Sequence, residues 1–406
     1  MSITATTNEA ATLAAGTDPE TQRVTAAVDA LLAEHDPTQT DDIVFRGARF
    51  DAGLAWVHFA EGDGGLGVRP ELNRLVEQRL KDAGAKPTHP STFFMALAGP
   101  TIATHGDDTV KARFLRPMFT GEEKWCQLFS EPGAGSDFAG LGTRAERDGD
   151  EWIVNGQKVW TTLAHLAKWG MLVARTDPDQ PKHKGMTYFV VDMEQEGVEV
   201  RPLRQMTGEA EFNEVYFTDA RVPDSERLGD TGEGWRVSLT TLMNERVSIG
   251  GTVPPKGSGP IAVAQKELLK GEATGEERDA FMQLWIRSEV HRLTNIRASQ
   301  NRKSGVPGPE GSVGKMASAD LNKDIFSFTM NLMGPEGMLY GTYDLEQPET
   351  SMAFSSPQKA FLRSRANSIE GGTTEVMKNI LGERVLGLPG DVRTDKEMSW
   401  SDVPRN

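Results

Sequence analysis

The sequence predicts an α+β chain with an N-terminal helical domain, a central small antiparallel β-barrel domain and a C-terminal four-helix-bundle-like domain. Hydrophobic residues recur at helical spacing up to residue 125, at strand spacing from 126 to 230, and at helical spacing again from 231. Because helices, strands and helices follow one another in blocks, the order excludes the alternation of a doubly wound nucleotide-binding sheet. We place the boundaries at 1–20 for a loose tail, at 21–125, 126–230 and 231–388 for the three domains, and at 389–406 for a polar tail.

Length and composition fit this organisation. The 406 residues correspond to roughly three domains at ~150 residues each. With 37% hydrophobic and 25% charged residues, the chain has a globular composition. The 44 Lys and Arg against 59 Asp and Glu give a net charge of −15, which argues against nucleic acid or an anionic membrane as the main partner. We find no run of ~18 apolar residues and therefore expect no membrane insertion.

The cysteines and histidines limit the cellular compartment that we expect and the kinds of metal site that the chain can form. Cys126 is the single cysteine, which excludes an intramolecular disulfide and a multi-cysteine metal site. The N-terminus also lacks the basic and apolar regions of a signal peptide, so we expect a cytoplasmic protein. The seven histidines form no HxxxH or HExxH pair, and we predict no metal.

In the N-terminal domain the helical pattern is strongest in two segments. Val24, Val28 and Leu31 share one face of a helix predicted over 21–35. A second amphipathic helix is predicted over 71–84, where Gly84 is a suitable C-terminal cap.

In the central domain, five or six short strand candidates fall within about 100 residues, which is typical of a small barrel or sandwich. Asn155-Gly156 lies between two apolar runs and predicts a β-hairpin turn. The further strand candidates lie at 169–176, 185–193, 198–206 and 211–223, and the last ends at a proline.

In the C-terminal domain, proline- and glycine-rich breaks at 251–260 and 305–314 separate the helical segments. The predicted helices lie at 232–251, 279–302, 317–333 and 373–388.

The segment with the most specific chemistry is WCQLFSEPGAGSDFAGLGT, residues 125–143. Its small residues, from Gly133 to Ser136, predict a turn that exposes consecutive backbone N–H groups and a hydroxyl. Such a turn suits a phosphate or pyrophosphate. On these residues alone, an ordinary glycine-rich turn is an equally good interpretation.

Three motifs in this order resemble the acyl-CoA dehydrogenase family. The first is SEPGAGSD, from Ser130 to Asp137, and the second is VNGQKVWTT, with Trp160 and Thr162. The third is the C-terminal signature IEGGTTEVMKNILGERVLG, residues 369–387. The resemblance covers roughly residues 21–388, and the helix–strand–helix order matches the family's architecture.

The resemblance implies FAD as the cofactor and an acyl-CoA as the substrate. By the family pattern, Gln127, Phe129 and Ser130 face the isoalloxazine, and Gly135 and Ser136 lie at the phosphates. Trp160 and Thr162 lie beside the flavin, and Gly371, Gly372, Thr373 and Glu375 form the turn that closes over it. Ser136, Arg246 and Gly371 are the expected substrate contacts. Without the flanking match, Trp160 would be interpreted as a barrel core residue.

The resemblance also implies a catalytic carboxylate, which removes an α proton from the acyl thioester while hydride leaves the β carbon. Where one group of the family has Glu directly before the Gly-Thr of the signature, this chain has Gly371. The other group, the long-chain and isovaleryl type, has Glu before Arg on the first C-terminal helix, and here Glu245 precedes Arg246. We therefore assign Glu245 as the base.

Helix geometry supports that assignment. Leu242, Glu245 and Ile249 share one helical face, and a lone carboxylate in an apolar stripe is costly unless it has a task. The alternative for Glu245 is a buried ion pair with a nearby Arg. Glu370 lies near a helix N-terminus, where the macrodipole alone favours an acidic residue.

The family resemblance therefore implies an FAD-dependent acyl-CoA dehydrogenase of fatty-acid or lipid metabolism. Its product is a trans-2-enoyl-CoA, and its electrons pass to an electron-transfer flavoprotein. We expect a homodimer or homotetramer, with a heteromer as the alternative. Two other functions stay open: a related oxidase or flavin monooxygenase, and a non-catalytic subunit of a heteromeric dehydrogenase. The segment expected to hold the adenine end of FAD diverges from the family, with Arg292, Arg297 and Arg302 as candidates.

Overall fold

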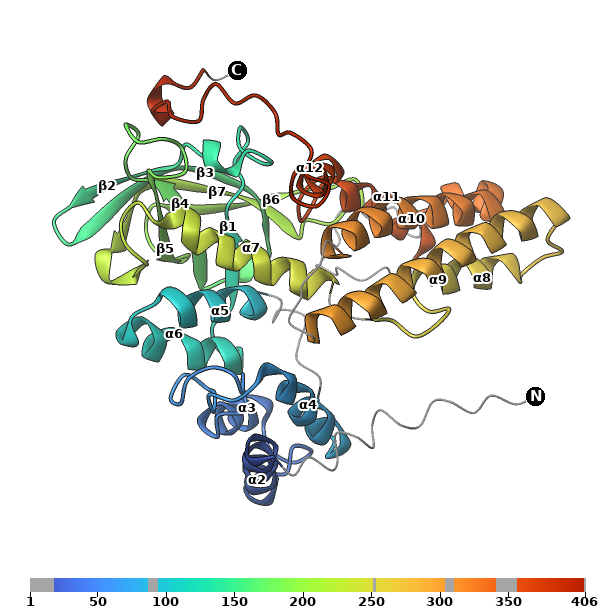
Figure 1. Cartoon of the computed structure of the whole chain (residues 1–406), viewed down its shortest axis with the longest axis horizontal. Helices are drawn as coiled ribbons and strands as arrows, with labels where there is room; N and C mark the ends of the chain where they lie inside the picture. Colours follow the sequence, from blue (N-terminus) through green and yellow to red (C-terminus); the bar gives the residue numbers. More distant parts are fainter. Residues whose placement is uncertain (1–17, 87–93, 251–252, 304–309, 341–355, 405–406) are drawn as a thin grey trace.

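The computed structural model describes residues 18–86, 94–250, 253–303, 310–340 and 356–404; the side chains of 246–250, 302–303 and 310, among them the candidate Arg302, lie outside the description. The predicted order of helices, strands and helices is confirmed (Figure 1). No helix in the described ranges combines the length and the apolar character needed to cross a membrane.

The N-terminal domain is helical, and aspartates begin three of its helices. Its helices are α2 (Pro19–Glu34), α3 (Asp42–Asp51), α4 (Asn73–Asp82), α5 (Met95–His105) and α6 (Asp108–Thr120). Asp18, Asp41 and Asp107 cap α2, α3 and α6 by accepting backbone N–H groups of the first turn. Gly84 follows α4 in the left-handed conformation, as a C-terminal cap requires.

The central domain is one eight-stranded sheet. Its strands are β1 (Trp125–Leu128), β2 (Arg144–Asp148), β3 (Glu151–Thr162), β4 (Trp169–Arg175), β5 (Met186–Asp192), β6 (Val198–Leu203), β7 (Phe212–Pro223) and β8 (Arg227–Leu228). Most neighbours pair antiparallel, as predicted, in the order β6-β7-β3-β2-β4-β5-β8. The sheet is nevertheless mixed, because β1 pairs parallel with β4, and β2 meets β4 in parallel at Arg144 and Arg175.

The predicted hairpin turn at Asn155-Gly156 is wrong. Both residues lie inside β3, where the pairing with β7 shifts register between Val154 and Gly156. A Cβ at Gly156 would lie 2.7 Å from the Cα of Thr143, so glycine serves a close backbone approach at a bulge. The actual hairpin joins β2 to β3 through Gly149, which has a φ of 63°.

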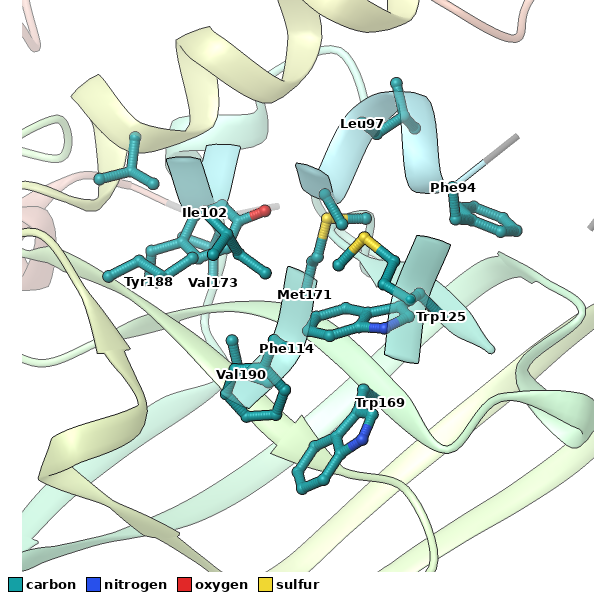
Figure 2. Close-up of a cluster of buried hydrophobic side chains, with 14 of the residues drawn as sticks. Phe94, Leu97, Ile102, Phe114, Trp125, Trp169, Met171, Val173, Tyr188 and Val190 are labelled. Carbon is teal, nitrogen blue, oxygen red and sulfur yellow. The ribbon is translucent and has the colours of Figure 1, made fainter. Parts of the chain in front are cut away.

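A shared hydrophobic core joins the N-terminal helices to the sheet. Helices α5 and α6 contribute Leu97, Ile102 and Phe114 to this core, and Figure 2 shows Ile102 and Phe114 among side chains of the strands. The labelled strand residues of this core are Trp125, Trp169, Met171, Val173, Tyr188 and Val190. Helix α7 (Gly234–Gly250) packs on α5 and β5, and its Val237 belongs to the same core.

The rest of the C-terminal domain is a helical bundle (Figure 1). Its helices are α8 (Pro260–Leu268), α9 (Gly275–Lys303), α10 (Glu310–Met333), α11 (Pro357–Ser364) and α12 (Thr374–Arg384). Helix α10 is central, since it packs against the other four. The sequence pattern predicted α9, α10 and α12 but not the short helices α8 and α11. After α12 the chain turns back over the sheet.

Candidate functional site

The small-residue turn between β1 and β2 is closed at its base by Glu131. The carboxylate of Glu131 accepts the backbone N–H groups of Gly142 at 2.7 Å and Thr143 at 2.9 Å. It also accepts a hydrogen bond of 2.8 Å from Lys158 Nζ on β3, whose side chain is fully buried. One carboxylate thus joins both ends of the turn, so the segment between them projects as a defined loop.

The apex of this turn faces open space. Gly133, Gly135 and Ser136 are exposed, and no atom lies within 4 Å of a Cβ built on either glycine. Neither glycine has a positive φ, so the backbone conformation does not demand glycine there. A ligand that approaches the backbone closely would demand it, which is the environment expected for Gly135 and Ser136 at a phosphate.

Trp160, near that turn, has an exposed side chain and a strained backbone conformation. It has a φ of 60°, a rare conformation for a residue with a bulky side chain, and its side chain is 57% exposed. The pairing of β3 with β7 is irregular here, between Lys158 and Thr161, and Thr162 ends the strand. The exposure rules out a core role for Trp160, and strain of this kind concentrates at binding sites; the contact with the flavin stays a prediction.

The end of β1 lies beside Trp160. The carbonyl oxygen of Ser130 accepts the N–H of Val159 at 2.9 Å, which places Ser130 next to the residue preceding Trp160. Phe129 is buried and stacks on Phe138 with the ring centroids 4.8 Å apart. Gln127 is half-buried on β1. The first two sequence motifs therefore meet in space.

The C-terminal signature forms the turn before α12. Gly371 and Gly372 have φ of 62° and 90°, conformations that favour glycine. Thr373 caps α12 by accepting the N–H of Val376 at 3.1 Å, and Glu375 is exposed in the first turn. Lys315 of α10 donates to the carbonyl oxygen of Gly372 and ties the turn to the bundle.

Glu370 is held in a structural ion pair. Its carboxylate accepts two hydrogen bonds from the Arg363 guanidinium, at 3.1 and 2.7 Å, and a third from Asn367 at 2.8 Å. These contacts occupy the carboxylate and weigh against a role as proton acceptor.

Arg363 also connects the C-terminal turn to the side chains around Trp160. Its guanidinium lies 3.8 Å from the Glu211 carboxylate and 5.7 Å from the centre of the Phe212 ring. Phe212 in turn meets Trp160 edge to face, with the centroids 5.8 Å apart. The second and third motifs, far apart in sequence, thus lie on one connected cluster of side chains.

Glu245 lies near the end of α7 and is half-buried. One turn earlier, the Thr241 hydroxyl is 2.9 Å from that of Thr101 and 3.1 Å from that of Tyr188, which fixes α7 against α5 and β5. Leu242 packs against the shared core, as the helical face predicted. The side chains of Arg246 and Ile249 lie outside the described residues.

Three cationic residues that organise the site stand outside the predicted set: Lys158, Arg175 and Arg363. Each is a buried or nearly buried cation with at least one partner that is distant in sequence: Glu131, Ala139 and Glu211, respectively.

These residues fit a flavin dinucleotide. The open apex of the turn could hold the pyrophosphate with backbone N–H groups and Ser136, and Trp160 presents an aromatic face for the ring system. Within the part of the chain that the structure describes, no cluster of three or more His, Cys, Asp or Glu side chains is arranged to hold a metal ion.

Comparison with known proteins matches two parts of the chain to family profiles. Residues 126–220 match the middle domain of acyl-CoA dehydrogenase, and residues 232–386 match its C-terminal domain. The acyl-CoA dehydrogenase FadE34 of Mycobacterium tuberculosis is 37% identical over 92% of this chain, which spans about half (49%) of that relative's length. The acyl-CoA dehydrogenase IpdE1 of the same organism is 36% identical over 84% of this chain and 86% of its own. The ChsE4–ChsE5 complex from M. tuberculosis contains a similar fold, with a TM-score of 0.66 and 25% identity over 93% of this chain and 99% of that one.

Proposed function

The chain belongs to the acyl-CoA dehydrogenase family of flavoprotein oxidoreductases, and on that premise we propose that it oxidises an acyl-CoA thioester to the trans-2-enoyl-CoA. The observation that supports this proposal is that contacts connect the three motifs. Ser130 accepts the N–H of Val159 beside Trp160, and Arg363 contacts both Phe212, which packs on Trp160, and Glu370, which precedes the Gly371 turn.

The residues assigned from the motifs, together with Glu245 and Arg246, each have a task in the proposed reaction. Glu245 accepts the proton from the α carbon, and the Gly371 N–H holds the thioester oxygen as negative charge develops there. FAD, when bound, supplies the acceptor for the hydride of the β carbon. Ser136 and Arg246 contact the substrate, and Trp160 and Thr162 orient the cofactor's ring. The ion pair with Arg363 keeps Glu370 from competing for the proton.

We further propose that the physiological electron acceptor is an electron-transfer flavoprotein and that the chain acts as an oligomer. FadE34 is about twice as long as the matched region, and the structure with the ChsE4–ChsE5 chains is a complex. Both support an assembly that pairs such units, as a homodimer, a heteromer or, from two pairs, a homotetramer. Light scattering of the purified, FAD-loaded chain, alone and with a related chain, measures which of these forms.

The test is anaerobic mixing of the purified yellow protein with a panel of acyl-CoAs while the flavin absorbance near 450 nm is followed. Bleaching by at least one acyl-CoA, with the enoyl-CoA recovered, is the expected result. A protein that neither contains nor takes up FAD contradicts the proposal. Rapid O₂ consumption after reduction would identify the oxidase alternative. If the chain bound FAD but its flavin bleached only after a partner chain was added, the chain would be a non-catalytic subunit.

A further inference from the structure

We propose that the C-terminal strap, residues 395–402, is a positioning element that holds the back of the cofactor turn in its binding conformation. The inference rests on the proposed function, since it concerns the turn that takes the pyrophosphate. The strap lies beyond residue 386, where the match to the C-terminal family domain ends.

Trp400 makes the first contact between the strap and the turn. Its indole Nε1 donates a hydrogen bond of 3.2 Å to the carbonyl oxygen of Gly140, and its ring covers the Arg175 guanidinium at 4.9 Å. Arg175 itself donates to the carbonyl oxygens of Ala139 at 2.6 Å and Lys182 at 2.8 Å. Trp400 therefore shields the cation that gathers the backbone carbonyls behind the turn.

Asp395 makes the second contact, through Lys182. The Lys182 ammonium lies 2.8 Å from the Asp395 carboxylate and 3.0 Å from that of Asp137, the last residue of the SEPGAGSD motif. Only 9% of the Lys182 side chain is exposed. Burial lowers the pKa of Lys182, but the two carboxylates outweigh it and raise the pKa overall. Asp395 therefore helps to keep Lys182 charged and in place against Asp137.

Backbone hydrogen bonds fix the register of the strap on the connection between β4 and β5. The N–H of Trp400 donates to Gln180 and that of Ser401 to Pro178, both at 2.9 Å. Backbone hydrogen bonds, the Asp395–Lys182 ion pair and the Trp400 ring over Arg175 thus hold the strap against the central domain. It leaves the apex exposed at Gly135 and Ser136, so it restrains the turn without covering the ligand face.

This arrangement makes Trp400 and Asp395 positioning residues for cofactor affinity, not catalytic residues. Without the strap, Arg175 and Lys182 each lose one restraint, and residues 137–142 sample more conformations. Binding FAD would then have to order them, and that cost lowers affinity. The rate of a chain saturated with FAD should change little, because Glu245 and the Gly371 turn are untouched.

The test compares Trp400→Ala, Asp395→Asn and the control Val392→Ala, a residue that is 93% exposed and lies three residues before the strap. The apoprotein is titrated with FAD, its melting temperature is measured without FAD, and the rate of flavin bleaching is measured at saturating FAD. We expect Trp400→Ala to raise the FAD dissociation constant by about tenfold or more. Asp395→Asn should raise it by less, and Val392→Ala should leave it unchanged. Trp400→Phe, which keeps a ring over Arg175, should recover part of the affinity.

Dissociation constants within twofold of wild type for both strap variants would overturn the inference, and so would a lower melting temperature with unchanged FAD affinity. If Trp400→Ala does not fold, Trp400→Phe and Asp395→Asn decide the matter by the same titration. A wild-type chain that binds no FAD overturns the proposed function instead, so the two failures are distinguishable.

Discussion

Lys158 and Glu131 form an ion pair of 2.8 Å directly beneath the small-residue turn, and the Lys158 side chain is wholly buried. Lys158 also donates to the carbonyl oxygen of Phe129 at 3.1 Å. Burial lowers the pKa of Lys158 despite the attraction of Glu131, whereas the Lys158 charge and hydrogen bonds overcome burial and lower the pKa of Glu131. The glutamate of the SEPGAGSD motif is therefore a structural residue that shapes the turn from below.

Removing one partner of this pair should be costly. Lys158→Met leaves the Glu131 carboxylate buried without its counter-charge, and we expect a loss of about 3 kcal/mol in the free energy of unfolding. The double variant Lys158→Met, Glu131→Gln should recover part of that loss. Lys168→Met, which removes a partly exposed pair with Asp192, is the control and should cost under ~1 kcal/mol. Urea denaturation measures all three, and equal losses for Lys158→Met and Lys168→Met would contradict the role assigned to the pair.

The two candidate bases should differ sharply. Glu245→Gln keeps the shape of the side chain but removes the proton acceptor, and we expect the bleaching rate to fall by ~10²–10⁴ with FAD content near normal. Glu370→Gln can still accept from Arg363 and Asn367, and should lose less than about tenfold. Stopped-flow reduction with one acyl-CoA measures both rates. The reverse order of effects would move the base to Glu370.

Trp160 should contribute little to stability and much to cofactor binding. Glycine accepts the left-handed φ without strain, so Trp160→Gly should change the free energy of unfolding by at most ~1 kcal/mol. Truncating a buried aromatic typically costs ~3–5 kcal/mol, and Trp152→Ala on the same strand, buried in the sheet's core, is the comparison. FAD titration of Trp160→Gly should show weaker binding. If Trp160→Gly lost as much stability as Trp152→Ala, Trp160 would have to be interpreted as a core residue.

One half-buried carboxyl predicts a pH dependence of stability. Burial, and then the neighbouring Asp192, raise the pKa of Glu226 to about 7 from an ordinary 4.5, although Arg113 opposes them. The folded state therefore binds more protons between these values, and stability falls as pH rises through that window. Glu226→Gln should remove that fall and stabilise the chain at pH 8 by about 1 kcal/mol after solvent screening. Melting temperatures at pH 5 and pH 8 measure this, with Glu233→Gln as an exposed control; a Glu226→Gln variant with the wild-type pH profile would refute it.

Patterns within short stretches of sequence predicted the elements that depend only on neighbouring residues. The long helices α2, α9 and α10 follow from their periodicity, and the strand ending at Pro223 follows from the missing N–H of proline. Gly156 was misread because the same dipeptide serves a turn or a bulge, and the approach of Thr143 decides between them. Helices α8 and α11 were missed because eight or nine residues carry too little periodicity, and packing on α10 stabilises them.

The site was predictable where its residues stand in short motifs. Ser130–Asp137, Trp160 and Gly371–Thr373 could be singled out because each motif is contiguous. Arg363 could not, since its partners Glu211, Phe212 and Glu370 are brought together only by the fold. The same holds for the strap, whose sequence is polar and without period.

The strap also constrains the order in which the chain can mature. The hydrogen bond between Trp400 and Gly140 spans 260 residues, so during synthesis the β domain and every C-terminal helix emerge from the ribosome before the turn receives this restraint. Contacts of such long separation form late, because closing the intervening loop is entropically expensive. A nascent chain would therefore carry a folded sheet with a loosely held turn, and tight FAD capture would mark the last stage of folding, not an early one.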